Sequence, residues 1–448
     1  MNKKKINLII YIYCLIIFLS CIIKFYDLEP SIDQIRHISW SLDLTKSDGL
    51  FGLNLTNFNF NDLKDKNTFL INLFRPAYSD IGHIFNVIPI LILSFFLILN
   101  FDPSITFNLI SILFYILNLL LIIKIIKITS YKILSNKLNS IDIIILTLFI
   151  SVPYYYFFSP LGLHNIAIFF LSLVIYKVIK VEKLNFENFI HITIFSIFGI
   201  FSHKTNIFFI PFIFLFFLIE KKYFKFFYLY FLSLSIFFLP IFFILIQIPS
   251  TGGSSIYFAN FDFSFKAIVI NFYLWFINIG KTLSFAYLTL FIIGFFVSLK
   301  YFKKLKVFYI LLSLHLFCYL LINSFSIYYL RTNLYVSYIV LIFICLFYFY
   351  VFENLKKYIK ILRILFLALI TFNFYIIYNI TNLKLINEEY YNFYFKNNKR
   401  LYNFISYEIE LKDNYKLIIY DNSTLDYLKV FNKNIYSLNL LFNKPIKN

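Results

Sequence analysis

Charge is scarce in this chain. Charged residues make up 14% of the 448 amino acids, whereas hydrophobic residues make up 61% and the mean hydropathy is +0.79. A soluble globular core could not hide so much apolar surface, so the composition excludes an ordinary soluble domain and predicts a polytopic membrane protein. Because ionisable groups are costly in lipid, the places where they gather are the main guide to function.

Cysteine is scarce as well. The four cysteines all fall inside apolar runs, at Cys14, Cys21, Cys318 and Cys345. In that setting they are interpreted as small buried hydrophobes and not as a disulfide framework or a metal cluster. The sequence therefore indicates no redox or zinc chemistry and no cofactor, and it leaves a divalent metal open.

The first apolar run, residues 8–23, comes after three lysines, Lys3, Lys4 and Lys5. No small-residue cleavage site follows this run. This pattern predicts an uncleaved first helix with its N-terminus in the cytoplasm.

Two further apolar runs, 81–101 and 104–126, are separated by residues that would end a helix. We expect 81–101 to form an amphipathic or re-entrant helix on the outer side.

The remaining apolar runs alternate with basic segments. Together with the first helix and 104–126 they predict eleven spans, the others being 141–160, 161–176, 189–202, 206–219, 226–248, 283–299, 307–323, 334–352 and 362–380. Basic residues gather at the ends expected in the cytoplasm, for example Lys300, Lys303, Lys304 and Lys306, or Lys356, Lys357, Lys360 and Arg363. The net charge of +19 is thus mostly a topology signal, and no nucleic-acid partner is expected.

The predicted fold is an all-α polytopic membrane protein with about eleven transmembrane helices. Residues 1–380 form the bundle, including a long outer first loop, 24–80, with interfacial helices. Residues 381–448 are expected to form a small α/β C-terminal domain outside the membrane, with a helix at 388–409 and a strand at 416–421. The expected location is the inner membrane of a bacterium, with the C-terminus extracytoplasmic.

The first loop carries an acidic stretch, YDLEPSIDQIRHISW, in which Asp33, Arg36 and His37 are spaced i, i+3 and i+4. On a helix these three would share one face. They could form a carboxylate with basic neighbours that handles a polar substrate, or only a solvated salt bridge on an interfacial helix. Asp27 and Glu29, in the same stretch, are alternative key acids.

Cations near the ends of the predicted spans are further candidates. FSHKTN places His203 and Lys204 between two short spans, where Lys204 could bind a lipid phosphate or simply extend to the headgroups. Arg331 in YYLRTN and Arg75 in NLFRPAYSD lie at other outer ends, and Arg suits bidentate phosphate or carboxylate binding. His164 in SPLGLHN is more typical of a capping or packing residue.

All these candidates are expected at the outer face, where no nucleotide donor is available. A carboxylate base beside phosphate-binding cations, open to both lipid and water, favours transfer from a lipid phosphate to a polar acceptor. Membrane lipids, a lipid-linked donor and a glycan or lipid acceptor are the expected partners.

The order of DQIRH, RPAYSDIGHIF and GIFSHKTNIFFIP along residues 3–211 resembles the GT-C superfamily of polytopic glycosyltransferases, which use polyprenyl-phosphate sugars. The resemblance is greatest to the bacterial members related to protein mannosyltransferases and aminoarabinose transferases. It implies a sugar transferase of envelope assembly in which Asp33 acts as base or acceptor ligand.

Two alternatives compete. SPLGLHNIAIFFLSLVIY followed by FSHKTNIFFIP also resembles the EpsG and Wzy-type repeat-unit polymerases of O-antigen, capsule or exopolysaccharide, although His164 and Asn165 stand where those proteins have Arg-Gln. A flippase or transporter of a lipid-linked sugar is the alternative from another class. Transporters usually show internal repeats and midplane charges, and the sequence shows no convincing repeat.

Overall fold

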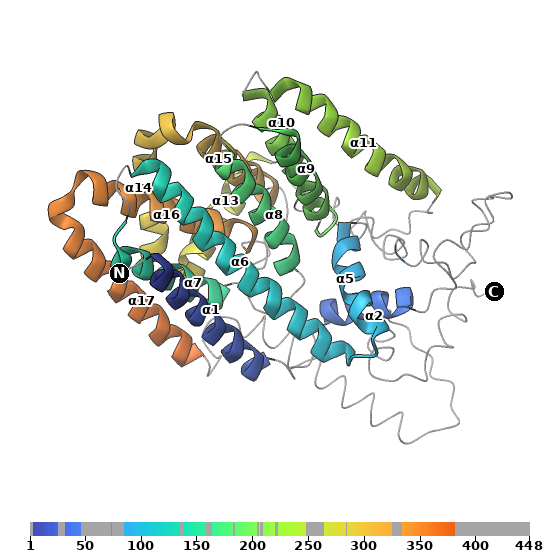
Figure 1. The fold of residues 1–448 in the computed structure, drawn as a ribbon, viewed down its shortest axis with the longest axis horizontal. Coiled ribbons are helices and arrows are strands. Elements are labelled where there is room, and N and C mark those ends of the chain that lie inside the picture. Colours follow the sequence, from blue (N-terminus) through green and yellow to red (C-terminus); the bar gives the residue numbers. More distant parts are fainter. Residues whose placement is uncertain are drawn as a thin grey trace.

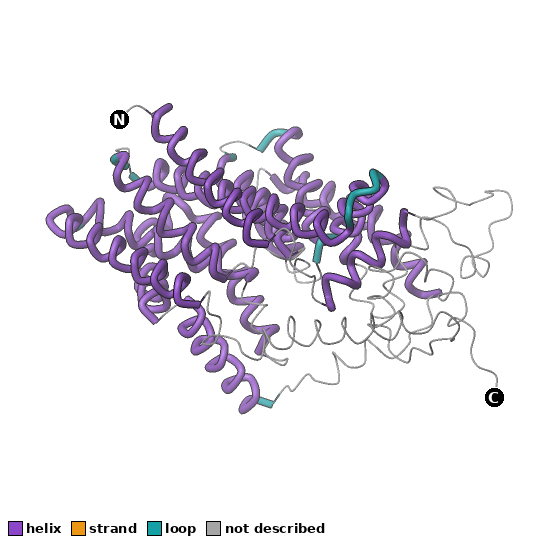
Figure 2. Tube along the Cα trace, turned by 90° about the horizontal axis from the view of Figure 1, so that it is seen from below, coloured by secondary structure: helices purple, strands orange, loops and turns teal. Residues whose placement is uncertain are grey.

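In the computed structural model, the described residues are 3–25, 32–45, 73, 85–134, 138–157, 164–181, 184–203, 206, 209–219, 223–247, 264–283, 285–324 and 334–380. Within these ranges all the regular secondary structure is helical, as predicted, and Figure 2 shows this part of the chain as a single helical body. The predicted C-terminal domain, 381–448, lies outside the described residues.

The described helices agree closely with the apolar runs of the sequence. Their bounds are α1 Lys3–Phe25, α2 Ile32–Thr45, α5 Val87–Ile98, α6 Pro103–Ile133, α7 Ser140–Phe157, α8 His164–Lys180, α9 Phe186–Ile200, α10 Phe209–Ile219, α11 Phe224–Gln247, α13 Phe265–Leu283, α14 Phe285–Ser298, α15 Phe302–Ser324, α16 Leu334–Asn354 and α17 Ile359–Ile380. Short 3₁₀ turns, η5 Leu299–Tyr301 and η7 Lys356–Tyr358, precede α15 and α17.

The predicted break after 81–101 is confirmed. Helix α5 ends at Ile98, and Asn100 adopts a positive φ of 61° that turns the chain. Asp102 then caps α6, because its side chain accepts a hydrogen bond of 2.9 Å from the backbone N–H of Ile105, and Pro103 occupies the first turn. The predicted bounds of the second run were wrong at its far end, since α6 continues from 126 to Ile133 and takes the basic residues into the helix.

The long helix α6 runs between two ends of the molecule that differ in composition (Figure 1). One end, here called the basic end, contains the end of α6, the start of α7, the turn from α14 to α15 and the turn from α16 to α17. Polar contacts between these segments hold them together. The other end, called the capping end, contains α2, α5, the start of α8 and the turn after α9. Figure 1 shows α2 and α5 at one side and the N-terminus of α1 at the other.

The middle of the bundle is packed closely enough to require glycine. A Cβ atom added to Gly294 of α14 would lie 2.2 Å from the carbonyl oxygen of Phe343 on α16. Small residues allow helix backbones to approach in this way in membrane bundles, where packing replaces the hydrophobic effect between helices. Helix α14 also packs on α7, where Phe149 stacks on Tyr287 with ring centroids 4.7 Å apart.

Apolar helices dominate the described part and indicate a membrane-embedded protein. Two stretches, Ile105–Ile133 and Phe285–Lys306, are long and apolar enough to cross a membrane. A bent pair, Tyr338–Asn354 and Lys356–Asn373, meets at 115° and adds a third if the two helices together make one span. Several shorter apolar helices accompany them. The predicted count of eleven spans, and the side of the membrane on which each end lies, stay predictions.

Candidate functional site

The capping end is organised around the first turns of α8. Asn118 of α6 donates its side-chain amide to the carbonyl of Asn165 at 2.7 Å. Asn206, which follows the turn after α9, donates to the carbonyls of Ala167 at 3.1 Å and Gly199 at 2.8 Å. Because Asn206 is only 1% exposed, these bonds are made away from water and fix the turn against α8.

Two histidines meet where these segments join. His164 is the first residue of α8 and His203 lies in the turn after α9, and their ring centroids are 4.8 Å apart in an edge-on arrangement. The backbone N–H of Asn206 also donates to the carbonyl of His203 at 2.9 Å, so the buried asparagine holds the turn that carries this ring. Both rings are half-buried. The structure thus unites the predicted site residue His203 with His164, which sequence reasoning treated as a packing residue.

Helices α5 and α2 pack against the same end. The backbone N–H of Ile88, in the first turn of α5, donates to the carbonyl of Phe201 at 3.0 Å, two residues before His203. Ser41 of α2 donates its hydroxyl to the carbonyl of Ile90 at 3.3 Å. Buried side chains from α2, α5, α6 and α8 then form one apolar cluster: Ile38, Leu93, Leu97, Phe107, Ile110, Ile166 and Phe170.

The acidic stretch of the first loop therefore enters this end through α2. The helix begins at Ile32, so Asp33, Arg36 and His37, spaced i, i+3 and i+4, lie on a helix, which is the condition for a shared face. The ring of His37 lies edge-on to that of Trp40 at 5.3 Å between centroids. The side chains of Asp33 and Arg36 are outside the described part of the structure.

Other predicted site residues also lie outside the described residues. These are Asp27, Glu29, Arg75, Lys204 and Arg331. His37 and His203 are accordingly the two predicted site residues whose side chains the structure describes, and both belong to the capping end.

A buried ion pair between described residues was not predicted and lies at the basic end. Asp142, in the first turn of α7, is fully buried and receives two bonds from Arg363 of α17, Nε to Oδ1 at 2.8 Å and Nη2 to Oδ2 at 2.9 Å. The hydroxyl of Tyr348 on α16 donates to the same carboxylate. A bidentate arginine and a phenol satisfy the buried charge, so Asp142 joins three helices.

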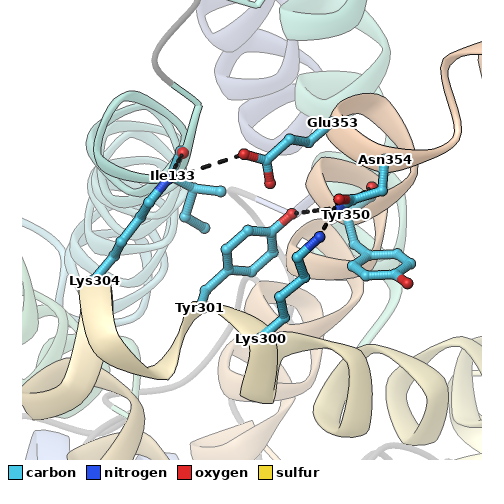
Figure 3. Close-up of polar contacts among 7 residues, drawn as sticks. All are labelled: Ile133, Lys300, Tyr301, Lys304, Tyr350, Glu353 and Asn354. Atoms are coloured by element: carbon cyan, nitrogen blue, oxygen red, sulfur yellow. Dashed lines mark hydrogen bonds and ion pairs between the residues drawn. The ribbon is translucent and has the colours of Figure 1, made fainter.

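A second polar group lies at the same end and is shown in Figure 3. Lys304 of α15 donates to the carbonyl of Ile133, the last residue of α6, at 2.8 Å, and its Nζ is 3.9 Å from Oε1 of Glu353. Lys300 donates to the side-chain oxygen of Asn354. These contacts tie the end of α6 to the turn before α15 and to the end of α16. Lys304, which lies at the C-terminus of α6, also complements the dipole of that helix.

Sequence reasoning treated Arg363 as a topology signal and did not consider Asp142. The signal that could have found the pair is one lone acid, in SIDIIIL, and one lone arginine, in KILRILF, each at the edge of an apolar run. Ionisable residues placed there usually pair with each other. Their partnership was hidden because 221 positions separate them in the chain.

The chemistry of the two ends differs accordingly. Every charged group described in the Asp142 cluster already has a charged or hydrogen-bonding partner within the bundle, which is typical of a structural contact. The capping end carries the half-buried imidazoles of His37, His164 and His203. An imidazole can donate, accept or carry a proton near neutral pH. Among the described residues, no group of three or more His, Cys, Asp or Glu side chains could hold a metal ion.

Comparisons of the chain with protein-family models, with curated proteins and with solved structures gave no match.

Proposed function

We propose that this protein is an integral membrane glycosyltransferase that moves a sugar from a polyprenyl-phosphate donor to an envelope glycan or lipid acceptor, and that the capping end carries the site. Asp33 acts as the base or acceptor ligand. Lys204, Arg331 and Arg75 bind the donor phosphate, with Arg36, His37 and His203 in support and Asp27 and Glu29 as neighbouring acids.

The observation that supports this proposal is the convergence of segments at the capping end. Helix α2, which carries the acidic stretch, packs on α5 through Ser41 and Ile90, and α5 bonds to the turn that precedes His203. The acidic stretch of α2 and the turn that carries His203, more than 150 positions apart in the sequence, thus reach one end of the bundle. That end is opposite the one where the lysines of the helix turns gather.

The chemistry required is modest. The donor already carries a good leaving group in its phosphate, so the enzyme has to bind that phosphate, orient the acceptor hydroxyl and remove its proton. A carboxylate provides the base, and cations stabilise the charge that develops on the departing phosphate. No residue at the basic end takes part in these steps.

The test is the glycan made by cells that lack the gene. We expect the lipid-linked glycans and the surface polysaccharide to lose one sugar while the chains still polymerise, and the wild-type gene to restore that sugar. Unchanged glycans would contradict the proposal. Complete lipid-linked glycan units that accumulate on the inner leaflet of the membrane would indicate a flippase.

A repeat-unit polymerase is the second candidate, and the contact between His164 and His203 favours it. The resemblance to these polymerases depends on the two stretches that carry these residues, and their rings touch at 4.8 Å. For a polymerase, the deletion would leave a single repeat unit on the lipid carrier and no long chains.

A further inference from the structure

The turn between α16 and α17 is an exposed basic corner. The two helices meet at 115° through η7, and the corner carries Lys356, Lys357 and Lys360, all of them exposed. Lys357 lies over the ring of its neighbour Tyr358, with Nζ 4.8 Å from the centroid, which still leaves the ammonium at the surface. We name these three lysines the corner lysines.

The acids near the corner are already engaged. Glu353 lies 3.9 Å from Lys304, and Asp142 is held by Arg363 and Tyr348. From 353 to 363 the sequence has no acid other than Glu353, and from 299 to 306 it has none. The positive charge of the corner lysines is therefore not balanced by a carboxylate from these segments.

An apolar strip continues from the corner along α17. Lys360, Ile364 and Leu367 are spaced i, i+4 and i+7, so they follow one face of the helix. Ile364 is 66% exposed and Leu367 43%, and the adjacent Ile361 is 63% exposed. Cations at a bend followed by exposed aliphatic side chains match the two parts of one lipid molecule, an anionic headgroup and an acyl chain.

We propose that the corner lysines bind the headgroup of an anionic phospholipid whose acyl chain lies along Ile361, Ile364 and Leu367. The Asp142–Arg363 pair holds α17 in place, so the lysines are presented at a fixed bend and not on a loose tail. This inference does not depend on the proposed glycosyltransferase activity.

The test is lipid binding to the full-length protein in neutral detergent, measured by native mass spectrometry during titration with phosphatidylglycerol. We expect the triple variant K356Q/K357Q/K360Q to bind phosphatidylglycerol at least about tenfold more weakly than the wild type, since each lysine near an anionic surface contributes to attraction. The matched control K124Q/K225Q/K266Q removes three exposed lysines elsewhere and should bind normally.

Two further measurements separate a lipid site from a general anion site. Phosphatidylcholine should bind the wild type and the triple variant equally, and soluble glycerol phosphate should not compete with phosphatidylglycerol. Equal weakening in both triple variants, or full competition by glycerol phosphate, would overturn the proposal. If the triple variant is not stably folded, the single variant K360E provides the same test, with K266E as its control.

Discussion

The two ends of the bundle are held together by different forces. At the basic end the contacts are charged: Arg363 to Asp142, and Lys304 to both Glu353 and the end of α6. At the capping end they are neutral: Asn118 and Asn206 bind helix carbonyls, and His164 touches His203. The contacts named at the basic end thus join opposite charges, whereas those named at the capping end join amides, carbonyls and imidazole rings.

This difference separates stability from function. A charge that is buried with its partner contributes to the fold but is not available to a substrate, because breaking the pair leaves an uncompensated charge. Neutral amides can fix the backbone of a site while leaving its charged groups for a ligand. The comparison predicts that variants at the basic end lower stability, whereas charge-removing variants at the capping end lower activity.

The largest loss of stability is expected from Asp142→Asn. The change leaves the guanidinium of Arg363 without its carboxylate. Because the Arg363 side chain is 24% exposed, we expect the free energy of unfolding to fall by about 3 kcal/mol, at the lower end of the range for broken buried pairs. Denaturant or SDS titration of the purified protein measures this loss of unfolding free energy.

Asp102→Asn is the control for the same chemical change at an exposed helix cap. It should cost less than about 0.5 kcal/mol, since asparagine caps as well as aspartate.

A double variant shows whether that loss comes from the pair itself. Asp142→Asn combined with Arg363→Gln should be clearly less destabilised than the sum of the two single variants, because the second change removes the charge that the first one orphaned. Additive losses, or an Asp142→Asn protein as stable as Asp102→Asn, would show that the contact does not hold the basic end.

An intermediate effect is expected from Asn206→Leu at the capping end. The change removes two buried hydrogen bonds, at 2.8 and 3.1 Å, and should cost about 1 to 2 kcal/mol. Since Asn206 also fixes the turn carrying His203, glycan synthesis should fall more than the amount of folded protein does. Asn188→Leu, in the first turn of α9, is the control and should leave both quantities near the wild-type level. A proportional fall of synthesis and folded protein would make the residue purely structural.

The smallest effect is expected from Glu353→Gln. The 3.9 Å separation from Lys304 and the partial exposure of both side chains predict a loss below about 1 kcal/mol, which should shrink further at high salt. The same titration measures it. A loss as large as that of Asp142→Asn would erase the distinction between the buried and exposed pairs.

Much of the fold could be predicted from the sequence because apolar runs and helix breakers are local signals. The break at Asn100 to Pro103 appeared where expected, and the stretch around Asp33 forms a helix. The stretch between the predicted spans 226–248 and 283–299 contains a helix that those spans do not include, α13, which packs against its neighbours α14 and α15. Its strong amphipathic pattern alone does not say which partner covers the apolar face.

The candidate site was predicted less completely, because its contacts are distant in the chain. His164 and His203 are 39 positions apart, and no local pattern shows that their rings meet. Asn206 was treated only as the start of a span, since a single asparagine carries little information until its carbonyl partners are known. The same limit hid Asp142 and Arg363.

Asp33, the acid near the start of α2, is expected to serve catalysis and not the fold. The measurement is the amount of lipid-linked glycan that Asp33→Asn produces, at equal membrane protein levels, relative to Asp43→Asn. Asp43→Asn is the control because it makes the same chemical change in the last turn of the same helix. We predict that Asp33→Asn abolishes the product while its stability stays at the wild-type level, and that Asp43→Asn retains the product. Full glycan synthesis by Asp33→Asn would contradict the account.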